Sequence, residues 1–317
     1  MNRPQISVVA PVFNEEETLP EFYRRVRAVM DGLGEPWELV LVDDGSSDDS
    51  FRIARELHEQ DPRVRVVRFA RNFGHQIAIT AGMDYARGDA VVTIDSDLQD
   101  PPEVIPDLVA RWREGYHVVY GVRAEREGET WFKLFTARLF YRLIAALTDV
   151  RIPMEAGDFR LLDRKVVEEM RRLREHRRFI RGMTSWVGYR QAGVPYHRHA
   201  RFAGQTKYPF RKMFRLALDA VTGFSDVPLR LIWTFGAALL MLGVVLGLIL
   251  LALRLAGQAP LAGQGLMLTA ALLLSGTQLL FLGIIGEYLA RIYDEVRNRP
   301  LYTVMEVLEG SENGPEK

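Results

Sequence analysis

The stretch ISVVAPVFNEE, from Ile6 to Glu16, sets the pattern for the first third of the chain. A short apolar run rich in β-branched residues ends in polar residues, and a helical pattern then covers Glu16–Met30. Similar strand patterns follow at Leu39–Asp43, Val64–Phe69, Ala90–Asp95 and Val118–Val122, with helical patterns between them at Asp48–Gln60, Gln76–Ala86 and Pro102–Glu114. This alternation predicts an α/β domain with a doubly wound, mostly parallel sheet that is covered by helices.

Three acidic clusters come at the ends of predicted strands. They are PVFNE at Pro11–Glu15, VDDGS at Val42–Ser46 and DSDLQDP at Asp95–Pro101. An Asp followed by Gly or Ser is often only a turn or a helix cap, which is the simpler interpretation of Ser47 and Asp48. Ligands of doubly wound sheets, however, bind beyond the carboxyl ends of the strands. Three clusters at that one edge therefore indicate a ligand site.

The third cluster carries a pattern that suits a metal ion. Asp95 and Asp97 point to the same side of an extended backbone, because side chains alternate along a strand. Their hard carboxylate oxygens suit Mg²⁺ or Mn²⁺ and leave coordination positions open for diphosphate oxygens. A metal held there neutralises charge on a departing nucleoside diphosphate. Because Asp-x-Asp alone often occurs by chance, the prediction of a metal site depends on the presence of the two other acidic clusters.

Several classes of protein are excluded by what the sequence lacks. It has no cysteine, which excludes disulfides, cysteine-zinc sites and thiol nucleophiles. It has no G-x-x-x-x-G-K-[ST] loop, no G-x-G-x-x-G after the first strand, and no G-x-S-x-G elbow. Its six histidines are scattered, and His197 and His199 have no third partner at zinc-site spacing. The nucleotide folds and hydrolases that carry these motifs are therefore disfavoured.

Two long apolar segments stand near the C-terminus. Neither Leu231–Leu253 nor Leu261–Gly286 contains a charged residue, and only Arg254–Pro260 connects them. Each is longer than the roughly 20 residues that cross a bilayer, so they predict a transmembrane hairpin over residues 229–288. Basic residues flank it on both sides, which places both of its ends in the cytoplasm by the positive-inside rule.

The hairpin divides the chain into three predicted parts. Residues 1–228 form the cytoplasmic catalytic domain, 229–288 the hairpin and 289–317 a cytoplasmic tail, with Glu309–Lys317 disordered. Residues 208–226 have a basic face and an apolar face, which favours an amphipathic helix in the membrane interface over a helix packed on the soluble core. The protein is therefore expected in the plasma (inner) membrane, as a multi-pass protein with its catalytic domain in the cytoplasm.

The charge of the chain is unevenly distributed. Lys+Arg and Asp+Glu balance at 41 each, but Arg160–Arg215 holds 16 basic residues against 4 acidic ones. Such a block favours phosphate or an anionic membrane surface as a partner, with a solvated Arg-rich helix as the alternative. The balanced total gives no sign of a nucleic-acid partner.

Taken together, the motifs resemble the inverting GT-A glycosyltransferases of family 2 that use polyprenyl-phosphate acceptors. The resemblance is strongest to the bacterial bactoprenol glucosyltransferase group, and dolichyl-phosphate mannose synthases are more distant relatives. The motifs that carry it, in order along the chain, are Pro11–Glu15, Val42–Ser46, Arg71–Gln76 (RNFGHQ), Asp95–Glu103, Gly157–Arg160 (GDFR), Arg201-x-x-Gly-x-Thr-Lys-Tyr208 and the hairpin. This order is much more specific than any single motif.

The resemblance implies a role for individual residues. The nucleotide-sugar would be bound by Pro11, Asn14, Glu15, Asp43, Asp44, Gln76, Asp95, Ser96, Arg201 and Lys207. Asp95, Asp97 and Gln99 would hold Mg²⁺ or Mn²⁺, and Arg123, Lys133 and Arg138 would receive the lipid phosphate. Asp97 and Asp158 would be catalytic, and Asp158 occupies the position of a general base.

The implied reaction is the transfer of one sugar, with UDP-glucose as the expected donor, to undecaprenyl phosphate with inversion, giving a β-linked product. Because the second pKa of a phosphate monoester is about 6, the acceptor is already a nucleophile and Asp158 orients it more than it deprotonates it. The alternatives are a GDP-mannose or modified-arabinose donor, then a processive polysaccharide synthase, although Q-x-x-R-W is absent, and then an inactive membrane scaffold. The sequence leaves open whether the chain forms a homo-oligomer.

Overall fold

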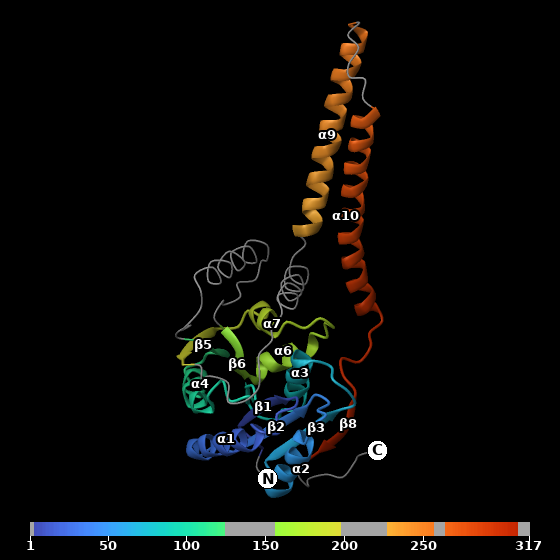
Figure 1. Ribbon diagram of the computed structural model, residues 1–317. Helices are drawn as coiled ribbons and strands as arrows, with labels where there is room; N and C mark the ends of the chain where they lie inside the picture. The colour runs from blue at the N-terminus through green and yellow to red at the C-terminus, as the bar shows by residue number, and fades with distance from the viewer. Residues whose placement is uncertain (1–2, 124–155, 198–226, 257–263, 310–317) are drawn as a thin grey trace. The chain divides into compact units, whose positions relative to one another are not determined.

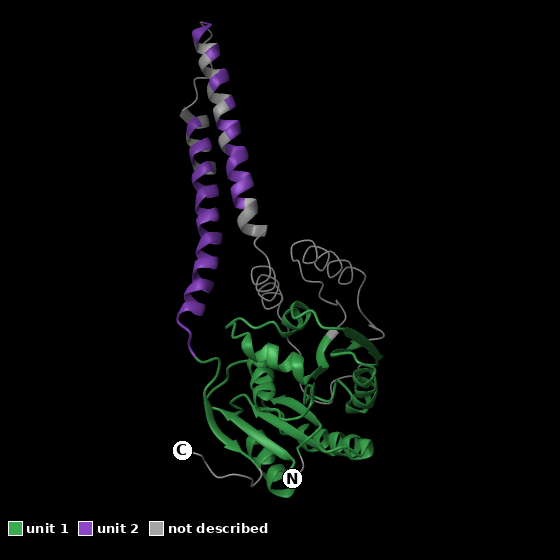
Figure 2. Cartoon of the chain, turned by 180° about the vertical axis from the view of Figure 1, so that it is seen from behind, with its two compact units in different colours: residues 1–145, 150–214, 300–317 green, residues 146–149, 215–299 purple. Residues whose placement is uncertain are grey.

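A computed structural model describes residues 3–123, 156–197, 227–256 and 264–309 (Figure 1). The chain divides into two compact units (Figure 2). The first unit comprises residues 1–145, 150–214 and 300–317, and the second comprises residues 146–149 and 215–299. The predicted interfacial helix at 208–226 lies outside the described residues.

The first unit has the alternating strands and helices that the sequence predicts. Its strands are β1 (Ile6–Val12), β2 (Trp37–Asp43), β3 (Val64–Phe69), β4 (Ala90–Thr93), β5 (Val118–Arg123), β6 (Ala156–Asp163), β7 (Gln191–Tyr196) and β8 (Val304–Leu308). Its helices are α1 (Leu19–Leu33), α2 (Ser50–Gln60), α3 (His75–Tyr85), the 3₁₀ turn η1 (Pro102–Val104), α4 (Ile105–Arg113), α6 (Arg164–Arg172) and α7 (Ile180–Trp186). The five strands and four helices predicted before residue 123 are all confirmed, with shifts of a few residues at their ends.

These strands form one mixed sheet in the order β7-β5-β6-β4-β1-β2-β3-β8. Strands β1 to β4 are parallel to one another, while β6 runs antiparallel to β4 and β5, and β8 runs antiparallel to β3. The prediction of a mostly parallel sheet is correct at the centre, but it missed both antiparallel strands. These two strands place residues from after position 155 beside strands from the first third of the chain.

Helices cover both faces of the sheet. On one face α1, α2 and α4 bury Phe22, Phe51 and Leu108 against the apolar side chains of the central strands. On the other face α3 lies so close to β1 that a Cβ on Gly82 would clash with the side chain of Val9. Because the central strands are buried on both sides, they consist almost entirely of apolar residues. The polar residues at their carboxyl ends stand out for that reason.

The second unit consists of two long helices, α9 (Val227–Leu255) and α10 (Gln264–Val296). They run side by side (Figure 1). The rings of Phe235 and Phe281 meet edge to face, with their centroids 6.0 Å apart. The two helical segments predicted from the apolar runs are therefore present. Many large apolar side chains on both helices are exposed, including Trp233, which is 76% exposed, and Leu279, which is 70% exposed.

The expectation of a transmembrane hairpin at 229–288 is not supported by the described residues. Among them, no helix has both the length and the apolarity needed to cross a membrane. The predicted end of the second span also differs, because α10 continues beyond residue 288 to Val296. Arg291 pairs with Glu287 one turn earlier, at 3.1 Å, and the helix ends only before Asn298, whose φ of 46° is left-handed, and Pro300.

The predicted cytoplasmic tail from residue 289 is also corrected. Its first part belongs to α10, and residues 304–308 return to the first unit as β8, on the open edge of β3. Arg55 of α2 pairs with Glu306 at 2.9 Å, and Tyr302 stacks on Phe69 with ring centroids 5.1 Å apart. Glu309, predicted to be disordered, pairs with Arg65 and Arg87, while residues 310–317 lie outside the described part. Sequence alone could not show this pairing, because an edge strand finds its partner only in the folded sheet.

Candidate active site

The ends of β1 and β2 meet through hydrogen bonds between their polar residues. The amide of Asn14 donates to Oγ of Ser46 at 3.1 Å, and its side-chain Oδ1 accepts from the amide of Ser47 at 2.9 Å. Asn14 has a left-handed φ of 57°, which Asn tolerates better than most residues. Oδ1 of Asp43 accepts from the amide of Ser46, whereas its Oδ2 is buried without a hydrogen-bond partner and lies 3.5 Å from Nε of Arg68. Asp43 therefore presents an acceptor to a ligand.

Other predicted nucleotide-binding residues have structural partners here. Asp44 accepts from the amides of Phe73 at 2.7 Å and Gly74 at 3.0 Å, and it thereby holds the loop before α3. Burial raises the pKa of Asp44, although these two amides oppose the shift. Glu15 accepts from the hydroxyl of Thr18 at 2.7 Å, at the start of α1. Asp44 and Glu15 therefore each have a structural role in the local fold, apart from any contact with a ligand.

The segment after β4 has a strained backbone. Leu98, between Asp97 and Gln99, has a φ of 62°, which is unfavourable for a residue of this size. The turn lets Oδ1 of Asp97 accept from the amide of Gln99 at 3.1 Å, while Oγ of Ser96 donates to the carbonyl of Pro11 at 2.8 Å and ties the segment to β1. The strain is found in the predicted metal motif, as is common at functional sites.

Asp158 of β6 lies at the centre of a charged cluster beside this motif. Arg181 of α7 contacts its carboxylate through Nε at 2.9 Å and through a second nitrogen at 3.2 Å, and Gln76 donates to it at 3.3 Å. His75, the first residue of α3, places Nε2 3.6 Å from Asp158 and 3.5 Å from Asp95. Strands β4 and β6 and helices α3 and α7 thus converge on one point.

Burial and neighbouring charges shift the pKa values of this cluster in opposite directions. Burial acts to raise the pKa of Asp158, but the charge and hydrogen bonds of Arg181 and a hydrogen bond from His75 outweigh it and hold the pKa well below its ordinary value. Burial acts to lower the pKa of His75, but the hydrogen bond to Asp158 and the charges of Asp95 and Asp158 raise it to about 9. At neutral pH His75 is therefore a cation and Asp158 an anion.

Asp95 differs from Asp158 because, within the part of the chain that the structure describes, the cation that pairs with it is His75 alone. Burial raises its pKa to about 6; the charge of His75 opposes this shift, and the charges of Asp158, Asp100 and Asp97 add to it. Several carboxylates thus act on Asp95 from nearby. The oxygen ligands of Asp95 and Asp97 fit a divalent cation. Among the described residues no group of three or more His, Cys, Asp or Glu side chains could hold a metal ion, so the two carboxylates would share it with other ligands.

The structure thus brings most of the predicted site residues to one edge of the sheet. Pro11, Asn14 and Glu15 lie at the end of β1, Asp43 and Asp44 at the end of β2, and Asp95 to Gln99 after β4, next to Gln76 and Asp158. Arg123 is the last residue of β5. Lys133, Arg138, Arg201 and Lys207 lie outside the described residues.

Two residues of the cluster were missed in the sequence. His75 lies inside the RNFGHQ motif, where only the neighbouring Gln76 was selected. The motif itself was the signal that would have identified it. Arg181 had no such signal, because it is one of 16 basic residues in its stretch and only the packing of α7 shows which carboxylate it meets.

Comparison with known proteins identifies the class of protein that this fold and site belong to. Residues 7–171, just over half of the chain, match the family described as glycosyl transferase family 2. The chain belongs to this family, as its motifs predicted, and its mixed α/β sheet is GT-A-like.

Individual relatives match over both units. The chain is 52% identical over 300 residues to the protein named "Uncharacterized glycosyltransferase YkcC" of Bacillus subtilis (strain 168), covering 95% of this chain and 93% of that protein. It is 41% identical over 301 residues to the bactoprenol glucosyl transferase of Shigella phage SfII, covering 95% and 97%. Among solved structures, glucosyl-3-phosphoglycerate synthase of Mycobacterium tuberculosis, in complex with Mn²⁺, UDP and phosphoglyceric acid, matches with a TM-score of 0.47 and 23% identity over 69% of this chain and 76% of that chain.

Proposed function

We propose that this protein transfers one glucose from UDP-glucose to undecaprenyl phosphate with inversion and releases a β-linked lipid-phosphate sugar. The observation that carries the proposal is the cluster of Asp95, Asp158, His75 and Arg181 at the carboxyl ends of the strands, in a family of glycosyltransferases. The donor and the acceptor are inferred from the relatives named bactoprenol glucosyl transferase.

The nucleotide is assigned to the ends of β1 and β2. The buried Oδ2 of Asp43, which has an ion pair with Arg68 but no hydrogen bond, is the acceptor that we assign to the N–H of a uracil base. Asn14 and Pro11 line the same edge, and Asp44 holds the loop of Phe73 and Gly74 in place beside it. Arg201 and Lys207 complete the donor site in this proposal.

Asp95 and Asp97, with Gln99, would hold Mg²⁺ or Mn²⁺. When bound, this ion supplies positive charge against the diphosphate leaving group. The raised pKa of Asp95 supports the assignment: burial raises it and the charges of Asp158, Asp100 and Asp97 add to the shift, and a cation there would favour the charged carboxylate.

The chemical step is an in-line displacement. An oxygen of the acceptor phosphate forms a bond to the anomeric carbon of glucose, and the bond from that carbon to the donor diphosphate breaks, with its electron pair leaving on UDP. Attack from the face opposite the leaving group inverts the configuration from α to β. Positive charge from His75 and Arg181 opposes the repulsion between the anionic acceptor and the carboxylates of the site.

Asp158 is assigned an orienting role more than that of a base. Its carboxylate is held by Arg181 and Gln76, and its low pKa makes it a poor proton acceptor. The acceptor phosphate is largely ionised at neutral pH, since its second pKa is about 6, so it needs no strong base. Arg123, Lys133 and Arg138 are proposed to bind this phosphate.

The lipid acceptor requires the protein to work at a membrane. We place it at the cytoplasmic face of the plasma membrane, and the exposed apolar side chains of α9 and α10, such as Trp233 and Leu279, support contact between the second unit and lipid. A polyprenyl tail stays in the bilayer, so only its phosphate has to reach the strand ends of the first unit.

The proposal is tested with the purified chain in detergent, undecaprenyl phosphate, Mg²⁺ or Mn²⁺, and a panel of UDP-glucose, GDP-mannose and a modified-arabinose donor. The lipid products are identified by mass spectrometry. We expect a lipid that carries one hexose with UDP-glucose alone and is absent with EDTA and in Asp97→Ala. Lipids that carry several sugars would show that the protein polymerises sugars and does not transfer a single one. Folded protein that forms no glycolipid with any donor would overturn the proposal.

A further inference from the structure

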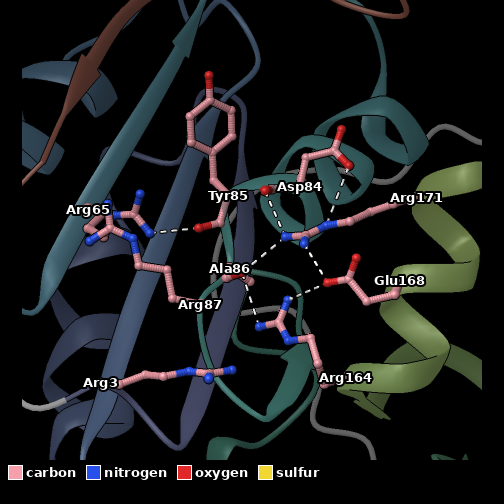
Figure 3. Close-up of a pocket in the computed structure, with 9 residues that line it drawn as sticks. All are labelled: Arg3, Arg65, Asp84, Tyr85, Ala86, Arg87, Arg164, Glu168 and Arg171. Carbon is pink, nitrogen blue, oxygen red and sulfur yellow. Dashed lines mark hydrogen bonds and ion pairs between the residues drawn. The ribbon is translucent and has the colours of Figure 1, made fainter. Parts of the chain in front are cut away.

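An arginine-lined pocket lies at the opposite edge of the same sheet. It has a volume of about 540 Å³ and is lined by Arg3, Arg65, Asp84, Tyr85, Ala86, Arg87, Arg164, Glu168 and Arg171 (Figure 3). Arg3 precedes β1, Arg87 precedes β4, and Arg164 follows the antiparallel strand β6, so the pocket is at the amino ends of the parallel strands. The candidate active site is at their carboxyl ends, and no residue is common to the two.

The lining of this pocket holds five arginines and two carboxylates. Three further carboxylates pair with these arginines, Glu38 with Arg65, Asp89 with Arg3, and Glu309 with Arg65 and Arg87, so a ligand anion has to displace a carboxylate that is already bound. Arg164 and Arg171 share Glu168, at 3.5 and 2.7 Å. Burial lowers the pKa of Arg164, and the charges of Arg171 and Arg3 lower it further, so these cations repel one another.

Several arginines of the pocket donate hydrogen bonds to backbone carbonyls. As Figure 3 shows, Arg171 donates to the carbonyls of Asp84 and Ala86 at the end of α3, and Arg164 and Arg65 donate to carbonyls of the same segment. Such carbonyls carry only partial negative charge. They therefore fix the positions of the guanidinium groups, and the carboxylates that pair with these groups supply the opposite charge.

Two N–H groups of the lining residues have no hydrogen bond, although one of them, Nε of Arg171, lies 4.0 Å from Oδ1 of Asp84. Nε of Arg65 and Nε of Arg171 are both buried without a hydrogen bond, and Arg65 is only 5% exposed. A buried donor left unsatisfied is costly, and a guanidinium group matches the oxygens of a phosphate in a planar fork. The rim already accepts one oxyanion, since the carboxylate of Glu309 lies 2.5 Å from Arg65 and 3.0 Å from Arg87.

We propose that this pocket is a second anion site, which binds a phosphate group and from which Glu309 is displaced. The phosphate belongs to a soluble phosphate compound or to an anionic lipid headgroup, and the chemistry that recognises it is the same in both cases. Glu309 follows β8 directly, so its displacement releases the ion pairs that hold the end of this edge strand.

The test uses the full chain in detergent with EDTA present. Pyrophosphate binding is measured by calorimetry for the wild type and for Arg3→Gln/Arg87→Gln, which changes two exposed side chains. The control, Arg111→Gln/Arg113→Gln, removes the same charge from exposed ion pairs on α4. Melting curves confirm that each variant is folded.

We expect pyrophosphate binding to weaken at least tenfold in Arg3→Gln/Arg87→Gln, to persist in the control and in Asp97→Ala, and to tighten several-fold in Glu309→Gln. Flotation with vesicles of phosphatidylglycerol and phosphatidylcholine, against phosphatidylcholine alone, identifies the source. Flotation that depends on phosphatidylglycerol and on the same two arginines assigns a lipid headgroup, and its absence assigns a soluble phosphate compound. The proposal is overturned if the wild type binds neither probe, or if Arg3→Gln/Arg87→Gln binds pyrophosphate as tightly as the wild type.

Discussion

The two edges of the central sheet carry charge in opposite ways. At the carboxyl edge, Asp95 and Asp158 are partly buried and share His75. At the amino edge, arginines of α6 bind the carbonyls that end α3, and carboxylates surround them. Helix α3 connects the edges, since His75 begins it and Tyr85 ends it.

This difference shows how similar residues serve different purposes within one fold. The carboxyl edge gathers like charges and a strained residue, Leu98, which cost stability and suit ligand binding. The arginines of the amino edge hold the packing of α3 and α6 against the sheet. A substitution at the carboxyl edge should therefore reduce activity without unfolding the protein. A substitution of an arginine that holds α3 and α6 at the amino edge should lower stability and leave the activity of the folded molecules unchanged.

The largest effect is expected for Asp97→Ala. Loss of a carboxylate that holds a divalent cation against the leaving group should lower kcat by about 10³-fold, since several kcal/mol of charge stabilisation is lost. Product formation with UDP-glucose is measured by mass spectrometry, and thermal unfolding provides the control, with a midpoint within a few degrees of the wild type. Wild-type turnover in this variant would remove Asp97 from the site.

A smaller effect on activity is expected for Arg181→Gln, about 10²-fold in kcat, because Arg181 positions Asp158. Without Arg181 the pKa of Asp158 rises toward its ordinary value, so the acid limb of the kcat profile should move to higher pH. Arg181→Lys should restore part of the rate and of the profile. An unchanged profile in Arg181→Gln would show that Arg181 is merely structural.

The amino edge is tested by Arg171→Gln. This change removes donors to three carbonyls at the end of α3 and should lower the free energy of unfolding by about 2 kcal/mol. Urea unfolding measures the loss, and kcat per folded molecule should not change. Arg172→Gln on the same helix, which removes only an exposed pair with Glu169, is the matched control and should cost less than about 0.5 kcal/mol. Equal losses of stability in the two variants would show that the hydrogen bonds from Arg171 to the end of α3 do not stabilise the fold.

The smallest effect concerns His75. Its pKa is raised from 6.5 to about 9 in the folded chain, so its contribution to stability is complete below pH 6.5 and is lost as the pH rises through 9. The side chain is 44% exposed, and after allowance for solvent screening the loss is about 1 kcal/mol. Thermal unfolding in EDTA between pH 6 and pH 10 should show this decline in the wild type and not in His75→Gln. The same slope in both proteins would contradict the assignment.

The sequence predicted the centre of the fold because the local signals agree there. Each strand from β1 to β5 is a short apolar run followed by a polar turn, and Asp43, Asp95 and Asp97 are recognisable by their place at such turns. The antiparallel strands β6 and β8 were missing from the prediction, because each pairs with a strand that is far away in the chain. Neither their length nor their composition indicates which edge they join.

What the sequence determined by itself is the alternation of strands and helices, the edge of the sheet that carries the carboxylates, and the family. These follow from periodicity and from motif order, which are local properties of the chain. Only the tertiary structure decided that His75 and Arg181 meet Asp158, that Glu309 reaches Arg65, and that the basic stretch in α6 binds the carbonyls of α3. The physical reason is that a charge finds its partner through packing between elements distant in sequence, and no periodicity encodes that partner.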